Sequence, residues 1–370
     1  MRKLSDRQNP GVYAQEYFDS LVGERVNTMI EHLHRIASHA YYCDEHDAGR
    51  RACERLLRMD LSPEKEEKVR ANRTWYTQRL DELVEVKFSP LTPGVYPGWS
   101  RFNPSVVIQD SVPLFNVRSS NYLIDENGRY VIPPEDGETI RTRNLLYDGL
   151  VAMPIYATYP RSAFPVDGLE DVRLNVIDGK LIASATVRDY ADQDGTCRIA
   201  YGTVADGWIH DLTCHDTENG VHEKNWMPIL GQDRWLYSCS ARGHVALVHD
   251  AGDEWRVEAY AKSPPVARAF RGGSQVVPIG GPDWLAVVHE VAVVNGRRVY
   301  EHRFVMFDET DWSIRAISEP FAFRETRTIE FAAGLAVNDR KAIVTFGVRD
   351  AEAWVAEIPM LDVLGLMDAP

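Results

Sequence analysis

The chain has 370 residues, of which 44% are hydrophobic and 26% charged, a balance typical of globular proteins. Its formal net charge of −14 disfavours a bulk electrostatic attraction to nucleic acid or to an anionic membrane surface. No run approaches the roughly 20 consecutive apolar residues that a membrane-spanning helix needs.

The cysteines and the N-terminal segment predict a cytoplasmic protein. The 5 cysteines show neither a Cys-x-x-Cys spacing nor a dense framework, so we expect free thiols in a reducing compartment. The first residues lack the apolar core of a signal peptide.

Residues 12–85 carry apolar side chains at helical spacing and predict three or four antiparallel helices. Ser62 is a candidate N-cap of one of them, with Pro63 at the first helical position. Segment 37–57 resembles a tetratricopeptide helix pair, about one repeat long. One repeat cannot bury its own apolar face, so we expect it to pack on the rest of the chain.

From about residue 88 onward, short β-rich runs alternate with glycine, proline and Asn-Gly or Asp-Gly turns. Many short, evenly spaced strands are typical of a sandwich, a barrel or a propeller. Roughly 270 residues would give five four-stranded blades of about 50 residues each, and tryptophans recur mostly at strand starts. We therefore predict a mainly β fold, with a helical, tetratricopeptide-like region at 1–87 and a five-bladed β-propeller at 88–370.

One long hairpin with an Asn-Gly turn can be read in register. Counting back from the turn pairs His289 with His302 and Glu290 with Glu301, and Arg303 then lies diagonal to Glu290. Two alternatives stay open, a polar network inside a blade or a functional site. In a functional site, Glu290 would be catalytic, and His289 and Arg303 would bind substrate. No third ligand accompanies the two imidazoles, so we predict no metal.

An acidic pair and an arginine stand just before a predicted strand–turn–strand unit. In an extended segment Asp171 and Arg173 share a face, and Glu170 points to the other side. An acid with an arginine nearby can hold a tuned protonation state for general acid catalysis. The alternative is a surface loop with an ion pair of little energetic value.

Amide and guanidinium groups gather in a third region. Asn103, Asn116, Arg118 and Asn121 are suited to sugar hydroxyls or to a phosphate, although asparagines also serve in turns. Arg271 precedes two glycines whose backbone N–H groups could face an anion, with a simple Gly-Gly turn as the alternative.

Glu223 and Glu330 are two further acidic candidates for a functional site. Glu223, Lys224, Asn225 and Trp226 place an acid, a base, an amide and an indole side by side, and Glu330 precedes an apolar run.

Several motifs occur in a fixed order over roughly residues 100–358: FNPSVV, NVRSSNYLI, GLEDVRL, EKNWMPI, RGGSQVVPI with WLAVVHEV, and IEFAAGLAV followed by FGVRDAEAW. They resemble the five-bladed β-propeller enzymes that include β-mannoside phosphorylases and β-mannosidases, and a divergent bacterial branch of them. Val172 stands where that family has proline in its Glu-Asp-Pro-Arg motif, and HEV replaces a Tyr-His-Gly ending.

The resemblance implies a central pocket at the propeller axis and catalysis by an aspartate. It makes Asp171 the candidate general acid, with Arg173 beside it. It also implies that Glu223 and Asn225 take sugar hydroxyls, while Trp226 packs against a ring face or props the loop.

The resemblance further implies no cofactor, with inorganic phosphate or a sugar phosphate as co-substrate. The residues that would hold it are Arg118, Lys224, Arg271 and Arg303. Phosphate as nucleophile needs no base, whereas water needs a second carboxylate, for which Glu290 and Glu330 are the candidates.

We therefore expect a carbohydrate-active enzyme that cleaves or transfers a mannoside-like glycosyl unit. One alternative is a glycosyltransferase of polysaccharide synthesis on the same scaffold. Another is a non-catalytic propeller that binds a glycan or a protein. The expected partner is a carbohydrate, and the N-terminal helices could dock a protein; no nucleic acid is expected.

Overall fold

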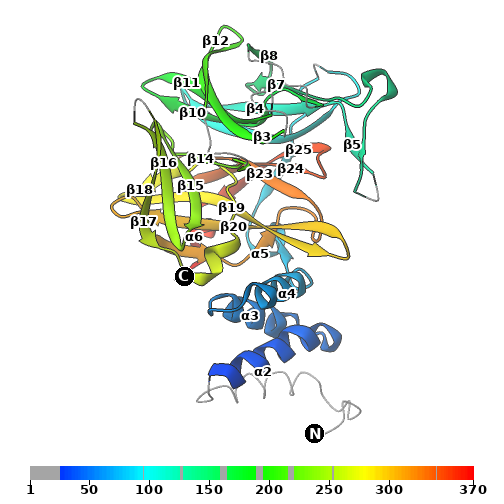
Figure 1. Ribbon diagram of the computed structural model, residues 1–370, viewed down its shortest axis with the longest axis vertical. Coiled ribbons are helices and arrows are strands. Elements are labelled where there is room, and N and C mark those ends of the chain that lie inside the picture. Colours follow the sequence, from blue (N-terminus) through cyan, green and yellow to red (C-terminus); the bar gives the residue numbers. More distant parts are fainter. Residues whose placement is uncertain are drawn as a thin grey trace.

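The first helices lie at one end of the molecule, and strands make up most of the rest (Figure 1). The predicted helical stretch at 12–25 lies outside the described residues. The computed structural model describes residues 26–94, 96–125, 128–158, 165–188, 195–215, 221–251, 254–338 and 340–370. In this part of the chain, no helix combines the length and the apolar character needed to cross a bilayer.

The N-terminal helices follow one another in short steps. They are α2 (Val26–His39), the 3-10 turn η1 (Ala40–Cys43), α3 (His46–Leu57), α4 (Pro63–Arg73) and the short α5 (Leu80–Leu83). Helix α4 begins as predicted, with Ser62 extended in front of it and Pro63 in its first turn. A last short helix, α6 (Met360–Gly365), lies near the C-terminus.

The tetratricopeptide comparison is not supported. Segment 37–57 holds the last turn of α2, then η1, then α3, so only one full helix of the expected pair lies within it. As expected for a segment that cannot bury its own apolar face, the helices pack on the propeller. Leu33 and Leu56 share one buried cluster with Val288 and Val305 of the fourth blade.

Five blades of four antiparallel strands make up the propeller. The first is β3 (Ser100–Gln109), β4 (Val112–Ser120), β7 (Ile140–Tyr147) and β8 (Ala152–Ala157). The second is β10 (Glu170–Ile177), β11 (Lys180–Val187), β12 (Arg198–Ala205) and β13 (Trp208–Cys214). The third is β14 (Met227–Pro228), β15 (Arg234–Ala241), β16 (His244–Asp250) and β17 (Trp255–Lys262).

The fourth blade is β18 (Val277–Gly280), β19 (Asp283–Val294), β20 (Arg297–Asp308) and β21 (Ile314–Ser318). The fifth is β23 (Glu330–Asn338), β24 (Lys341–Val348), β25 (Glu352–Pro359) and β2 (Lys87–Pro90). Short strands at the edges are β1 (Gln78–Arg79), β5 (Leu123–Ile124), β6 (Tyr130–Val131), β9 (Val166–Asp167), β22 (Phe321–Ala322) and β26 (Met367–Asp368).

The ring is closed by strands from both ends of the propeller sequence. Strand β2 precedes the first blade in the chain but pairs antiparallel with β25 of the last one. At the other side, β8 and β13 pair in parallel and join the first two blades into one sheet. The inner strands are tied together by the buried side chain of Gln275. Its Nε2 donates to the carbonyls of Val106 on β3 and Leu174 on β10, both at 2.8 Å, and its Oε1 accepts from Leu335 N on β23 at 3.0 Å.

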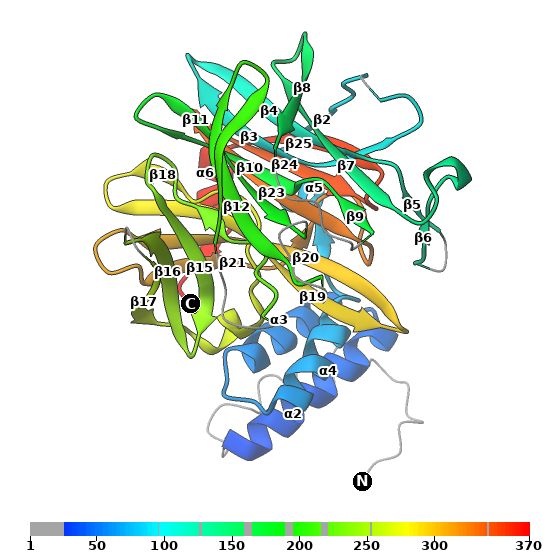
Figure 2. The same ribbon diagram turned by 45° about the horizontal axis from the view of Figure 1, so that its top comes forward.

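The β19–β20 hairpin has the predicted register. His289 lies opposite His302 and Glu290 opposite Glu301. In both views this hairpin of the fourth blade is the part of the ring that lies next to the helices α3 and α4 (Figures 1 and 2). This position decides what its charged residues contact.

Candidate active site

Two bulged strands turn an aspartate and an asparagine toward each other. Strands β3 and β10 each carry a bulge close to their first residues, at Asn103 and Asp171. Both residues are left-handed, with φ of +47° and +51°, a conformation that Asn and Asp tolerate better than most. Bulges re-aim side chains, and here Asn103 Nδ2 donates to Asp171 Oδ1 at 2.9 Å. Gly347 leaves room for this contact, since a Cβ there would lie 2.3 Å from Asn103 Oδ1.

Arg118 on β4 is the main charge partner of Asp171. Its Nη1 lies 2.8 Å from Asp171 Oδ1, and its Nη2 lies 3.6 Å from Glu170 Oε2. Burial alone would raise the pKa of Asp171. The Arg118 charge and the hydrogen bonds from Asn103 and Arg118 outweigh burial, so the pKa lies below its usual value. Asp171 is therefore a carboxylate at neutral pH in the unliganded protein.

Arg173 lies beside Asp171 but contacts its main chain. Its Nη1 donates to the Asp171 carbonyl at 3.2 Å and its Nε to the Gly273 carbonyl at 2.6 Å. The guanidinium also covers the ring of Phe331, 5.6 Å from the centroid. Burial lowers its pKa to about 10, so it stays cationic at neutral pH. Asp171 and Arg173 were expected to point to the same side of an extended strand. The bulge between Glu170 and Arg173 interrupts the alternation of side chains, so this expectation does not hold.

A second carboxylate, Asp350, was missed by the sequence interpretation. Tyr122 Oη donates to its Oδ2 at 3.0 Å. Burial raises its pKa, the Asp171 charge adds to this shift, and Arg118 offsets only part of it. Asp350 is also left-handed, with φ of +51°. It stands in the FGVRDAEAW motif, and this motif is the feature of the sequence that could have identified it as a site residue. Two carboxylates with opposite pKa shifts thus interact with one arginine.

We call Asn103, Arg118, Asp171, Arg173 and Asp350 the Asp171 cluster. Within it, Arg118 Nε and Arg173 Nη2 are buried donors without a hydrogen-bond partner among the described residues. Buried guanidinium donors normally find an acceptor. Hydroxyl and phosphate oxygens are acceptors that match them.

Tyr300 and His289 lie next to this cluster. Burial raises the pKa of Tyr300, which also feels the charges of Arg271, Asp350 and Asp171. His289 stacks on Tyr300 with the ring centroids 5.3 Å apart. Burial holds the pKa of His289 well below its usual value, and nearby positive charges including Arg271 add to this. The imidazole is therefore neutral, and the exposed Arg271 lies at the edge of the same group.

The Glu-Lys-Asn-Trp loop is built differently from its sequence interpretation. Trp226 is 1% exposed, so it props the loop and offers no face to a sugar ring. Its Nε1 donates to Glu223 Oε2 at 2.8 Å, and Tyr237 Oη donates to Glu223 Oε1 at 3.3 Å. Both carboxylate oxygens of Glu223 therefore have protein donors already. Asn225 is left-handed, and its carbonyl packs so closely on Gly272 that a Cβ there would lie 1.7 Å away.

Other predicted binding residues are used within the fold. Asn116 is fully buried and donates to Asn144 Oδ1 at 3.1 Å. Asn121 donates to the Thr139 carbonyl and accepts from Arg141 N, so it braces the loop between β4 and β7. Lys224 is exposed and interacts with Cys197.

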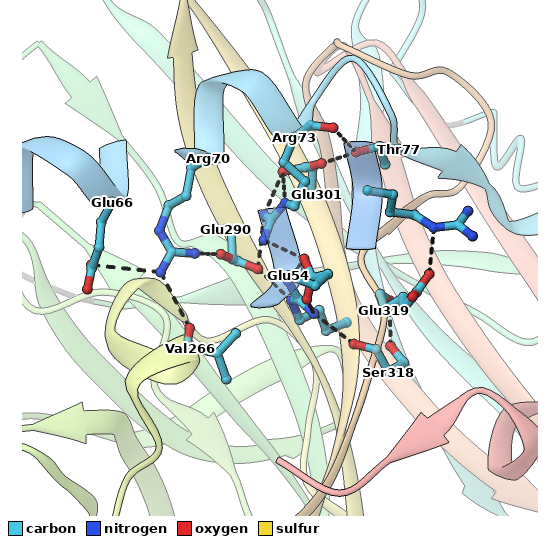
Figure 3. A network of polar contacts seen from close by, with 12 residues as sticks. Glu54, Glu66, Arg70, Arg73, Thr77, Val266, Glu290, Glu301, Ser318 and Glu319 are labelled. Atoms are coloured by element: carbon cyan, nitrogen blue, oxygen red, sulfur yellow. Dashed lines mark hydrogen bonds and ion pairs between the residues drawn. The ribbon is translucent and has the colours of Figure 1, made fainter. Parts of the chain in front are cut away.

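Glu290 and Arg303 belong to a buried ion network between the hairpin and the helices. Figure 3 shows Glu290 in this network, close to Arg70 and Arg73. Arg303 Nε donates to Glu290 Oε1 at 2.6 Å, which confirms the diagonal pair predicted from the register. Arg70 and Arg73 of α4 also pair with Glu290. Glu290 is 1% exposed, so the structure places it away from solvent and neutralised by arginines.

The same network holds the opposed glutamates together. Arg73 Nη2 lies 2.6 Å from Glu301 Oε2, and Arg303 Nη2 lies 2.8 Å from Glu54 Oε1 on α3. Three glutamates and three arginines thus balance one another; they are Glu54, Glu290, Glu301, Arg70, Arg73 and Arg303. We call this group the helix–blade network. Of the two alternatives for the hairpin, the structure favours the polar network.

Glu330 lies at the start of β23 and braces a loop. Its carboxylate accepts from the backbone N–H groups of Phe323, Arg324 and Glu325 at 2.6, 2.9 and 2.9 Å. It is fully buried, and burial raises its pKa to about 7 against the pull of these donors. These hydrogen bonds tie Glu330 to its own loop and not to Asp171.

The imidazole pair of the hairpin does not assemble a metal site with other ligands. The rings of His289 and His302 lie 6.5 Å apart. Among the described residues, no three His, Cys, Asp or Glu side chains are grouped to hold a metal ion.

Comparison with known proteins supports the fold. No protein-family model and no curated protein sequence matches the chain. Solved structures do match. The β-1,2-mannobiose phosphorylase from Listeria innocua has a TM-score of 0.51 and 13% identity, over 78% of this chain and 98% of that one.

Two further structures give the same result. One comes from a description of the GH130 family of mannoside phosphorylases, which contains glycoside hydrolases that target β-1,2-mannosidic linkages in Candida mannan. It has a TM-score of 0.51 and 14% identity, over 76% of this chain and 96% of that one. A mannose phosphorylase from Leishmania mexicana, in complex with phosphate, has a TM-score of 0.50 and 13% identity, over 80% and 92% of the two chains. The predicted propeller fold is confirmed, and at this identity the likeness concerns the fold.

Proposed function

We propose that the Asp171 cluster cleaves glycosides of the mannoside type, with phosphate or water accepting the glycosyl unit. The proposal rests on the arrangement around Arg118. Asp171 and Asp350 interact with it and have pKa values shifted in opposite directions. Buried guanidinium donors of Arg118 and Arg173 also lack acceptors among the described residues. Pairs of carboxylates with divergent pKa values are typical of acid–base sites. The solved structures with this fold include mannoside phosphorylases and hydrolases.

Asp171 is the proposed general acid, which protonates the oxygen of the leaving group. It rests as a carboxylate because Arg118 stabilises its charge. A phosphate that binds Arg118 would compete for this arginine and add a negative charge nearby. Both effects raise the pKa of Asp171, so the acid gains its proton when the co-substrate is bound.

Asp350 replaces Glu290 and Glu330 as the proposed second carboxylate. Glu290 is neutralised by three arginines, and Glu330 is held by backbone donors in its loop. Asp350 interacts with both Arg118 and Asp171. If water is the nucleophile, Asp350 is therefore the group that would activate it.

Phosphate binding is assigned to arginines near Asp171. Arg118 and Arg173 have the unused buried donors, and Arg271 lies exposed beside Tyr300. Arg303 and Lys224 are removed from the proposal, because Arg303 is occupied in the helix–blade network and Lys224 interacts with Cys197.

The test is a product assay with β-1,2-mannobiose, with and without inorganic phosphate. We expect a sugar 1-phosphate when phosphate is present if the enzyme is a phosphorylase, and free mannose in both conditions if it is a hydrolase. Asp171→Asn should lower turnover by roughly 10²–10⁴-fold.

Asp178→Asn is the matched control. Asp178 is an exposed residue at the tip of the β10–β11 hairpin, on the same strand pair as Asp171, and it is also left-handed. This variant should keep full turnover. Unchanged turnover in Asp171→Asn would contradict the proposal. Binding of the sugar without turnover in the wild type would instead favour the non-catalytic propeller.

A further inference from the structure

A cavity lies between the first and the second blade, beside the Asp171 cluster. Its volume is about 330 Å³, at the lower end of the ~300–1,000 Å³ range of small-molecule sites. Strands β7, β8, β9 and β13 line it. Thr142 connects it to the cluster, because its Oγ1 accepts from Arg118 Nη2 at 3.4 Å. The cleavage proposed for the Asp171 cluster gives this cavity no role.

An aromatic pair forms one wall of the cavity. The parallel pairing of β8 with β13 sets Tyr156 beside Trp208. Their ring centroids are 5.3 Å apart, and the two residues are 47% and 45% exposed. Exposed aromatic rings held in place by strand pairing offer a rigid apolar surface at little entropic cost.

A second aromatic pair stands close by. Tyr96 stacks on Trp99 with centroids 5.3 Å apart and planes inclined by 25°. Tyr96 is near enough to Tyr156 and Arg143 for both to influence its pKa, which burial raises. The chain ahead of β3 therefore brings additional aromatic surface to the neighbourhood of the cavity.

The polar edge of the cavity carries no net charge. Arg143 Nη2 donates to Asp167 Oδ2 at 3.0 Å, and the two side chains are 30% and 18% exposed. The pair presents hydrogen-bond donors and acceptors together, which vicinal hydroxyls require. Because the charges cancel, the edge suits a neutral ligand better than a sugar phosphate.

The backbone fixes the position of this edge. Strand β9 pairs in parallel with β7, with Arg141 opposite Asp167. At Gly168 a Cβ would lie 2.3 Å from the Thr142 carbonyl, and φ is +112°, so the approach of the two strands needs glycine. The edge is thus preformed, as is usual for binding sites.

We propose that this cavity is a second carbohydrate-binding site, which holds a neutral sugar ring against Tyr156 and Trp208 with its hydroxyls at Arg143 and Asp167. The combination suits a sugar, because a pyranose ring has an apolar face for the aromatic pair and a rim of hydroxyls for the ion pair. The site goes beyond the cleavage assigned to the Asp171 cluster and needs no catalytic group. A glycan chain long enough to reach both would be anchored at one and cut at the other.

The test is affinity electrophoresis in native gels that contain soluble mannan, glucan or xylan. We expect at least one polysaccharide to retard the wild type. Asp171→Asn should be retarded equally, whereas Trp208→Ala and Tyr156→Ala should lose the retardation at least tenfold in apparent affinity. Trp208→Phe keeps an aromatic face and should recover most of the affinity.

Trp75→Ala is the matched control. Trp75 is 38% exposed and follows α4, at the opposite end of the molecule from β7 and β8 (Figure 1). This variant should run like the wild type. The proposal is overturned if no polysaccharide retards the wild type, if Trp208→Ala is retarded normally, or if retardation depends on Asp171. Because the assay needs no turnover, its failure is separable from a failure of the cleavage assay.

Discussion

The helix–blade network and the Asp171 cluster both combine arginines with carboxylates, but they are built in different ways. In the helix–blade network three glutamates meet three arginines, and every carboxylate has at least one ion pair with a neighbour. In the Asp171 cluster the carboxylates have pKa values shifted in opposite directions, and guanidinium donors remain without an acceptor among the described residues. Both nevertheless use the same two kinds of charged group, carboxylates and guanidiniums.

This difference in construction suggests a structural role for the helix–blade network and a functional role for the Asp171 cluster. A balanced, fully buried set of charges is costly to disturb and offers nothing to a ligand. A set with unused donors and divergent pKa values can bind an anion and move a proton. Substitutions in the helix–blade network should therefore lower stability, and substitutions in the Asp171 cluster should lower turnover. The expected effects range from a large loss of stability to a small pH dependence.

Arg73→Met should destabilise the fold by roughly 3–5 kcal/mol, because it leaves buried carboxylates without their partner. Arg73 is fully buried and pairs with Glu54, Glu290 and Glu301. The measurement is the free energy of unfolding from urea titration. Arg79→Gln is the control, since Arg79 is 43% exposed in its own ion pairs and should cost under ~1 kcal/mol. Equal costs for the two variants would contradict the structural role of the network.

Arg118→Gln should reduce turnover by roughly 10²–10³-fold, the usual loss when one positioned donor at a charged transition state is removed. It should also raise the pKa of Asp171, since the opposing burial would then dominate. The pH profile of kcat/KM separates these effects. The part of the profile that reports the titration of Asp171 should move to higher pH in the variant. If it does not move, Arg118 does not set the pKa of Asp171.

Acid should weaken the helix–blade network. Burial would raise the pKa of Glu54, but Arg303 and Arg73 lower it to about 2 from an ordinary value of 4.5. A depressed pKa in the folded state stabilises above the unfolded value and loses this contribution as pH falls. The unfolding free energy of the wild type should therefore drop between pH 4.5 and about 2. The drop should be shallower in Glu54→Gln, and identical slopes would exclude Glu54 as a source.

Glu330 should change the stability in the opposite direction. Its pKa is raised from 4.5 to about 7, so the folded state binds the proton more tightly than the unfolded state. Its contribution to stability is therefore lost as pH rises from 4.5 to about 7. Glu330→Gln should remove this part of the pH dependence, measured as the difference between variant and wild-type urea midpoints across that range. A constant difference would contradict the raised pKa.

The sequence predicts what depends on local geometry. An Asn-Gly turn fixes the hairpin register, and from it follow the opposed Glu290 and Glu301 and the diagonal Arg303. It does not predict the partners from the helices, because Arg73 and Glu301 are 228 residues apart along the chain. That distant contact favours the polar-network alternative for the glutamates of the hairpin.

The candidate site shows the same limit. Asp171, Arg118 and Asn103 were predicted from their residue types and motifs, and the structure brings them into contact. Of the two roles expected for Trp226, against a sugar ring or as a prop of the loop, the structure favours the second, because His215, Tyr237 on β15 and Trp255 on β17 enclose its ring. Asp350 was not predicted. It lies between β24 and β25 of the fifth blade, and only the folded ring brings it close enough to interact with Asp171 on the second blade.

The most direct test of the contrast between the two clusters measures turnover and unfolding free energy together in two variants. Asp171→Asn should abolish most of the turnover on β-1,2-mannobiose and lose less unfolding free energy than Arg73→Met, because Asp171 has one close ion pair whereas Arg73 pairs with three glutamates. Arg73→Met should lose several kcal/mol of stability and keep its turnover per folded molecule. Turnover that survives in Asp171→Asn, or disappears in folded Arg73→Met, would contradict the assignment of chemistry to one cluster and structure to the other.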